Sequence, residues 1–146
     1  MIADPDQASA LSDLAETLGL SLADDIIEAA VADGALTVAV QRPSISKVLK
    51  FLRDDTNCQF TQLVDLCAVD FPEREERFDV VYHLLSMNHN LRIRVKVTAS
   101  EETAVPTASK VFSCANWFER EVWDMYGVFF SDHPDLRRIL TDYGFD

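Results

Sequence analysis

Three carboxylates lie close together near the C-terminal end of the sequence, at Glu119, Glu121 and Asp124. Paired carboxylates are the groups that general acid–base catalysis and glycoside hydrolysis use. On a helix, Glu121 and Asp124 would share one side, because they are three residues apart. However, Arg120 stands beside them, and the sequence offers no nucleophile, glycine-rich phosphate loop or recognisable triad nearby. We therefore expect these acids to serve structure or a protein interface, with acid–base catalysis as the alternative.

The element that must position these acids is the segment NWFEREVWDMYG, residues 116–127. Its spacing predicts a helix, in which Phe118, Val122 and Met125 form an apolar stripe that Trp123 and Tyr126 widen. Roughly half of the helix surface is then apolar, which is more than one core-facing side needs. We predict a double-sided helix that faces its own core on one side and a partner protein on the other.

The polar residues of this segment also fit a helix. Arg120 precedes Asp124 by four residues and predicts an ion pair between them. Glu119 and Glu121 lie toward the N-terminal end, where the helix dipole favours acidic side chains. Gly127 predicts the helix end, because glycine readily adopts a positive φ.

A second dense segment covers residues 132–145 and mixes large apolar groups with adjacent arginines. Terminal segments fray unless they contact something, so this run is expected either to fold back or to lie on another chain. Arg137 and Arg138 are candidate anchors, because the planar guanidinium pairs well with carboxylates. The apolar residues of the run are Leu136, Ile139, Leu140, Tyr143 and Phe145.

The remaining sequence predicts an alternation of helices and strands. Residues 7–18 predict a helix ended by Gly19, and a second helix begins near Ser44 and ends near Asp55. Asp33 and Gly34 form a turn dipeptide between two short strands. The predicted strands cover residues 26–31, 36–40, 60–69, 78–86 and 91–98.

The order helix, two strands, helix, three strands and C-terminal helices predicts an α+β fold, a two-layer α/β sandwich with a mixed or antiparallel sheet. We expect one domain over residues 1–146. In the last strand Arg92, Arg94 and Lys96 alternate with apolar residues, which predicts one apolar and one basic face.

Composition excludes several classes of protein. With 25 acids against 13 bases, the net charge of −12 makes a nucleic-acid partner improbable. No apolar run reaches the ~18 residues of a membrane span, and the N-terminus lacks the features of a signal peptide, so cytosolic residence is expected. Cys58, Cys67 and Cys114 form no C-x-x-C pair, and the three histidines are scattered, so the spacing predicts no metal site.

The two dense segments, EREVWDMYG at 119–127 and HPDLRRILTDYGF at 133–145, resemble the C-type subunit of NADH-quinone oxidoreductase, which is the thirty-kilodalton subunit of respiratory complex I. The resemblance extends to LVDLCAVDFPEREERFDVVYHLLS at 63–86 and RIRVKV at 92–97. It covers the chain strongly from about Phe60 onward and only loosely before that.

The resemblance implies a core scaffold subunit in the peripheral arm of a proton-translocating enzyme, without catalytic residues or a cofactor of its own. In such an enzyme, electrons pass from NADH through FMN and iron–sulfur centres of other subunits to quinone. The expected partners are the D-type and B-type subunits. The expected place is the cytoplasmic side of the bacterial inner membrane, or the matrix side in an organelle, with membrane contact only through the complex.

The family motif marks thirteen positions as partner-contacting or fold-defining. They are Glu119, Arg120, Glu121, Trp123, Asp124, Tyr126, Gly127, His133, Leu136, Arg137, Arg138, Asp142 and Tyr143.

Two departures from the family pattern stand out. Asp132 occupies a turn position where the family is expected to have Gly, which adds a charge and a Cβ and can alter the backbone angles. The chain also ends at Asp146, where relatives are expected to continue, so residues 128–146 are expected to be a partly extended docking tail that looks truncated. Two alternatives stay open: the equivalent subunit of a membrane-bound hydrogenase or other complex-I-like oxidoreductase, and a stand-alone enzyme that uses the three acids.

Overall fold

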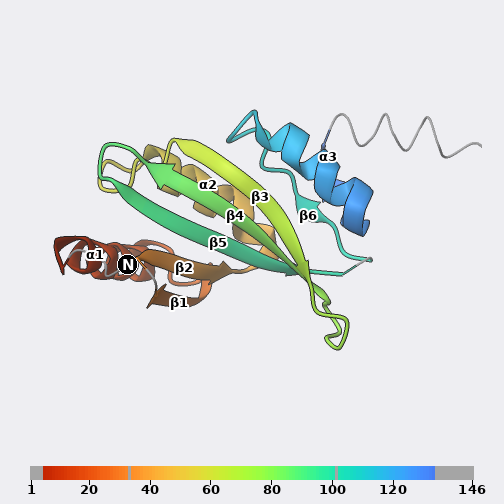
Figure 1. Cartoon of the computed structure of the whole chain (residues 1–146), viewed down its shortest axis with the longest axis horizontal. Helices are drawn as coiled ribbons and strands as arrows, with labels where there is room; N and C mark the ends of the chain where they lie inside the picture. Colours follow the sequence, from red (N-terminus) through yellow and green to blue (C-terminus); the bar gives the residue numbers. More distant parts are fainter. Residues whose placement is uncertain (1–4, 33, 101, 134–146) are drawn as a thin grey trace, which may run out of the picture.

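The computed structural model describes residues 5–133, except 33 and 101. Within that part the chain forms three α-helices, one 3-10 helix and seven strands (Figure 1). In chain order these are α1 (Pro5–Ser21), β1 (Ile26–Ala32), β2 (Ala35–Val40), η1 (Arg42–Ser44), α2 (Ile45–Asp54), β3 (Gln62–Asp70), β4 (Phe78–Ser86), β5 (Leu91–Ala99), β6 (Val105–Pro106), α3 (Ala115–Tyr126) and β7 (Phe130–Ser131).

Five strands form one mixed sheet in the order β1-β2-β5-β4-β3. The neighbours β1 and β2, β5 and β4, and β4 and β3 are antiparallel, whereas β2 and β5 run parallel. A parallel pair needs a long crossover, and here the chain between β2 and β5 supplies α2, the edge strand β3 and the strand β4. The predicted mixed sheet is confirmed.

The strands alternate between two environments. Every second residue of β4 and β5 is buried in the core: Val80, Tyr82, Leu84, Ile93, Val95 and Val97. The residues between them are mostly half-buried or exposed, and Arg92, Arg94 and Lys96 stand among these, as their alternation predicts. One face of the sheet therefore meets the helices, and the other face is open to solvent.

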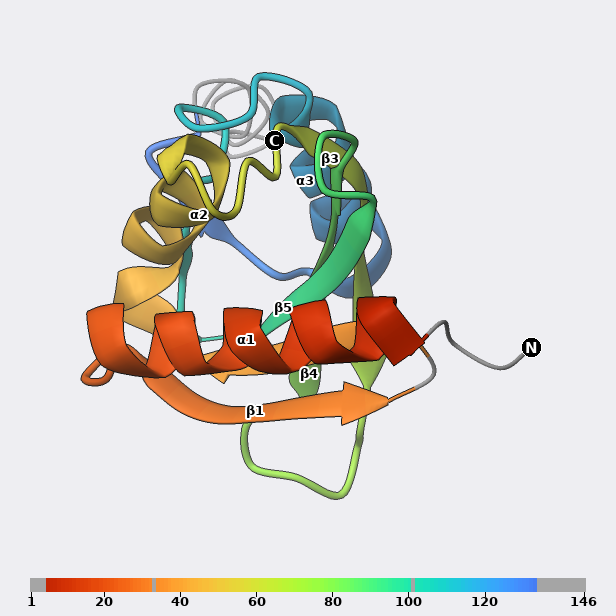
Figure 2. The ribbon, with the colours of Figure 1, turned by 90° about the vertical axis from the view of Figure 1, so that its left-hand side faces the viewer.

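The three helices contribute to one shared core on the covered face. In Figure 2, α1 runs along β1 while α2 rises away from it, and Figure 1 shows α3 beside β3. The four apolar residues that predicted the second helix, Ile45, Val48, Leu49 and Leu52, are all buried. The structure thus confirms a two-layer α+β fold.

The end of α1 differs from the sequence prediction, whereas α2 begins and ends where predicted. α1 does not end at Gly19 but continues to Ser21, because Leu22 extends the buried stripe and its N–H reaches the Leu18 carbonyl at 2.8 Å. Ser44 does stand at the N-cap of α2, but its hydroxyl does not cap the helix. It donates instead to Asp25 at 2.7 Å. The hydrogen bonds from Lys47 and then from Ser44 lower the pKa of that carboxyl.

Candidate functional site

The helix α3, which contains most of the segment NWFEREVWDMYG, packs against β3. Its aromatic rings contact mainly residues of this chain. Val122 is buried, and Phe118, Trp123 and Tyr126 pack half-buried against the core. Tyr126 meets Phe78 edge to face with ring centroids 5.9 Å apart, and Trp123 meets Phe129 in the same way at 6.0 Å. Such aromatic pairs contribute about 0.5–1.5 kcal/mol beyond the area they bury.

The buried side of α3 is rotated from the predicted stripe. Met125, which the spacing groups with Phe118 and Val122 in one stripe, is 72% exposed, whereas Val122 is buried. The buried face runs instead through Ala115, Glu119 and Val122, with Tyr126 at its C-terminal end. A carboxylate therefore occupies a core position that the sequence pattern assigns to an apolar residue.

Glu119 is fully buried and has three polar neighbours. The Thr107 hydroxyl donates to Oε1 at 2.6 Å, and the Ala108 N–H donates to Oε2 at 2.7 Å. The ring of His133, also buried, brings Nε2 to 3.7 Å from Oε1, while that nitrogen donates to the Asn116 carbonyl at 3.0 Å. The carboxylate thus ties α3 to the segment that follows β6 and to the turn that follows β7.

The environment of Glu119 favours its neutral form. Burial raises the pKa of the carboxyl to about 7, although the hydrogen bonds from Ala108 and Thr107 pull it down. The fully buried Tyr82 lies close enough for the Glu119 charge to add to burial in raising the tyrosine pKa. Among the described residues, the buried Tyr82 hydroxyl and the buried Nε of Arg120 have no hydrogen-bond partner, so the core near Glu119 holds a polar group that is not satisfied.

The chain after α3 returns to the domain. Gly127 ends the helix with φ at +76°, the left-handed conformation predicted for it. Val128 and Phe130 are fully buried, and β7 pairs in parallel with β6. Residues 128–133, the start of the expected docking tail, thus pack on this chain. Asp132 adopts φ at +63°, so the turn keeps a conformation that glycine would favour.

The opposite side of α3 faces solvent and carries large apolar groups. Trp117 is 60% exposed and Met125 is 72% exposed, and Glu121 and Asp124 lie exposed between them. Arg120 does not form the predicted ion pair with Asp124, because its guanidinium lies over the Trp117 ring, 5.8 Å from the centroid. We call Trp117, Glu121, Asp124 and Met125 the outer face of α3.

The structure separates the three acids that suggested catalysis. Glu119 points into the core, whereas Glu121 and Asp124 are exposed on the outer face. They do not converge on one cavity, as a pair of catalytic carboxylates must. The geometry therefore supports packing and contact better than acid–base chemistry at this site.

The thirteen motif positions divide into four groups. Glu119 and His133 are buried, while Arg120, Trp123, Tyr126 and Gly127 are half-buried and Glu121 and Asp124 are exposed. Leu136, Arg137, Arg138, Asp142 and Tyr143 lie outside the described residues. Sequence reasoning missed Thr107 and Tyr82, whose roles arise only from the folding of distant segments around Glu119.

The model of the family described as respiratory-chain NADH dehydrogenase, 30 Kd subunit, matches residues 38–146. The chain belongs to this family. The match begins in β2. It includes β3, β4 and β5 of the five-stranded sheet, α3 and the residues that contact Glu119.

Curated relatives agree with this membership. The C-type subunit of NADH-quinone oxidoreductase from Rhodospirillum rubrum is 58% identical over 141 residues, which cover 97% of this chain and 66% of the relative. The same subunit of Paramagnetospirillum magneticum is 62% identical over 138 residues, which cover 94% of this chain and 69% of the relative. The chain thus spans about two thirds of the length of these relatives.

A solved structure shares the fold. A chain from the membrane-bound sulfane sulfur reductase, an archaeal respiratory membrane complex, superimposes with a TM-score of 0.72 at 24% identity, covering 85% of this chain and 72% of that one. At this identity the likeness shows the fold alone. No helix among the described residues is both long and apolar enough to cross a membrane.

Proposed function

We propose that this chain is a scaffold subunit in the peripheral arm of a proton-translocating NADH-quinone oxidoreductase. The observation that carries the proposal is the 53–62% identity to relatives named as the C-type subunit of NADH-quinone oxidoreductase. In this role the chain binds no electron-carrying cofactor of its own, and FMN and iron–sulfur centres in other subunits carry electrons from NADH to quinone. It sits on the cytoplasmic side of the inner membrane, or on the matrix side in an organelle.

The outer face of α3 is the contact that we assign to a neighbouring D-type or B-type subunit. Trp and Met are enriched at the centres of protein interfaces, and a large exposed Trp is uncommon on a surface that meets only water. Trp117 and Met125 are the largest apolar groups on this face. Glu121 and Asp124 between them favour a partner that offers basic side chains.

Affinity purification from host membranes tests the assignment. The full chain carries a tag, and mass spectrometry identifies the proteins that it retains. We expect the flavin-bearing, iron–sulfur and quinone-site subunits to be recovered together. Recovery of the tagged chain without any of them would overturn the scaffold role.

The second candidate is the equivalent subunit of a membrane-bound hydrogenase or another complex-I-like oxidoreductase. The fold shared with the sulfane sulfur reductase chain is compatible with it, but the identity to that chain is only 24%. The electron donor separates the two. The captured complex is expected to reduce quinone with NADH, whereas reduction driven only by hydrogen or ferredoxin would favour the second candidate.

A stand-alone enzyme is the remaining alternative. Purified chain would then turn over a substrate and lose that activity on Glu121→Gln. The exposed and separate positions of Glu121 and Asp124 argue against it.

A further inference from the structure

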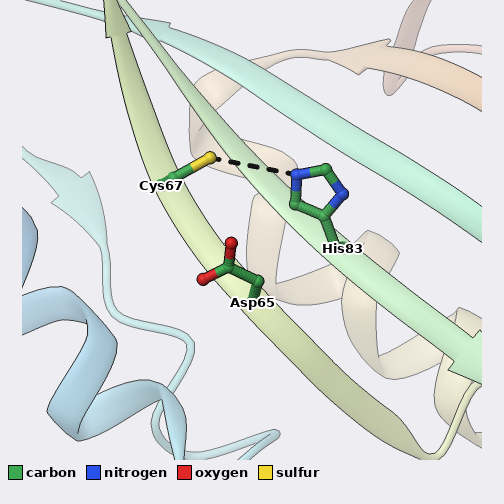
Figure 3. A group of neighbouring side chains, drawn as sticks. All are labelled: Asp65, Cys67 and His83. Carbon is green, nitrogen blue, oxygen red and sulfur yellow. Dashed lines mark hydrogen bonds between the residues drawn. The ribbon is translucent and has the colours of Figure 1, made fainter.

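Three metal-ligating side chains meet on the open face of the sheet, far from α3 in sequence. Asp65 and Cys67 come from β3, and His83 comes from β4 (Figure 3). In the sheet register Asp65 stands directly opposite His83, and Cys67 is two residues further along β3. The scattered cysteines and histidines give no hint of this grouping in the sequence, because it depends on how two strands pair.

A β-bulge in β3 places the side chains of Asp65 and Cys67 on the open face of the sheet. The register of β3 against β4 shifts between Leu63 and Asp65, so that one extra residue stands in β3. Leu63 faces the core, and strict alternation would place Asp65 and Cys67 on the same covered side. The bulge reverses the alternation, which leaves Asp65 exposed and Cys67 half-buried on the face that carries His83.

The donor atoms are close to the geometry of a tetrahedral zinc site. One ligand atom from each of the three side chains lies within 4.8 Å of the other two, and Cys67 Sγ is 3.8 Å from His83 Nε2. With Zn–S at about 2.3 Å and Zn–N at about 2.0 Å, tetrahedral ligands place sulfur and nitrogen about 3.5 Å apart. The Leu66 N–H donates to Asp65 Oδ1 at 2.9 Å, which orients that carboxylate and leaves its other oxygen available.

The chemistry of the set selects the metal. Thiolate and imidazole are ligands of borderline-soft ions, whereas Mg²⁺ and Ca²⁺ take oxygen ligands. Two anionic ligands, Asp65 and the Cys67 thiolate, match the charge of a dication. The neutral imidazole of His83 offers a ring nitrogen to such an ion. The Cys67 thiol must release its proton to solvent when the metal binds, because the thiolate is the ligand.

We propose that Asp65, Cys67 and His83 form a Zn²⁺ site on the open face of the sheet, with water as the fourth ligand. Arg94 stands opposite His83 on β5 and opposes the cation by like charge. With three protein ligands and a like charge beside it, the site binds Zn²⁺ more weakly than a closed four-ligand site.

Calorimetric titration of the untagged full chain with Zn²⁺ tests the site. We expect one ion to bind per chain. Cys67→Ser or His83→Ala should weaken binding by more than about 100-fold, because loss of a residue that only hydrogen-bonds to a ligand already weakens metal binding by up to about 100-fold. The matched controls Cys114→Ser and His89→Ala remove an exposed thiol and an exposed histidine and should leave the affinity unchanged. Circular dichroism confirms that each variant is folded.

Two further readouts identify the ligands without relying on affinity alone. Zn²⁺ should slow alkylation of Cys67 by iodoacetamide and leave that of Cys114 unchanged, and Co²⁺ should show a thiolate charge-transfer band that Cys67→Ser abolishes. Arg94→Ala should tighten binding, because it removes the opposing charge. Absence of one-to-one binding, or binding that survives in the folded Cys67→Ser and His83→Ala variants, would overturn the proposal.

Discussion

Replacing Glu119 by Gln should abolish one component of the pH dependence of stability. The carboxyl is buried with the Thr107 hydroxyl and the Ala108 N–H as donors, and its pKa is raised to about 7. A glutamine amide resembles the protonated carboxyl, because its oxygen can accept from Ala108 while its NH₂ donates to Thr107. The variant therefore keeps the packing and removes only the ionisation.

The sign of the effect follows from the two pKa values. In the unfolded chain the carboxyl has its ordinary pKa of 4.5, and in the folded chain it has a pKa of about 7. Between these values the unfolded state has released its proton and the folded state has kept it, so the free energy of unfolding falls as pH rises through this window. The loss is nearly complete by about pH 8. Between pH 5 and pH 8 it amounts to about 2 to 3 kcal/mol.

Urea unfolding followed by tryptophan fluorescence at pH 5, 6, 7 and 8 measures this difference. The free energy of unfolding of Glu119→Gln, minus that of the parent, should grow by about 2 to 3 kcal/mol across the range. Glu121→Gln, on the outer face of the same helix, serves as the control and should show no such trend. A Glu119→Gln difference that stays flat with pH would refute the raised pKa.

Three further predictions follow from the packing of α3, from two glycines and from a buried thiol. Trp123→Ala should destabilise the chain by about 2 to 3 kcal/mol, which is less than for a fully buried ring because Trp123 is only half-buried. A loss of less than about 1 kcal/mol in chemical denaturation would contradict this. Gly127→Ala should lower stability by about 1 kcal/mol through strain alone, since its φ is +76° and a Cβ there meets nothing within 4 Å. Gly19→Ala should raise stability by up to about 1 kcal/mol, because α1 continues past this residue. If the midpoint of thermal unfolding shifts in the same direction in both glycine variants, this pair of predictions is refuted. Cys58 should resist iodoacetamide at pH 8 until urea unfolds the chain, because burial and the nearby Asp55 raise its pKa to about 12; mass-spectrometric labelling as fast as at the exposed Cys114 would show otherwise.

The local elements of this fold are readable from the sequence because their signals are local. The helical spacing of Ile45, Val48, Leu49 and Leu52 identifies α2, and the alternation of Arg92, Arg94 and Lys96 identifies β5 and its open face. The predicted end of α1 at Gly19 is wrong. An exposed glycine in the last turns destabilises the helix by less free energy than the burial of Leu22 contributes.

The polar centres are not readable in this way, because they depend on pairing between distant segments. Glu119 becomes a core residue only when Thr107 and His133, 12 and 14 residues away, fold against it. Asp65 meets His83 only through the register of β3 and β4 and the bulge that precedes it. Periodicity identifies which face of an element is apolar but carries no information about the partner of a single polar side chain.

The scaffold role is tested most directly by measuring NADH-driven quinone reduction in material captured from host membranes on the tagged chain. We expect the captured complex to carry this activity and the purified chain to lack it. Trp117→Ala combined with Met125→Ala should reduce the captured activity while leaving the unfolding of the chain nearly unchanged, because both side chains are exposed. Capture without NADH-driven activity would contradict the assignment to this enzyme. Full capture by the double variant would contradict the outer face of α3 as the contact.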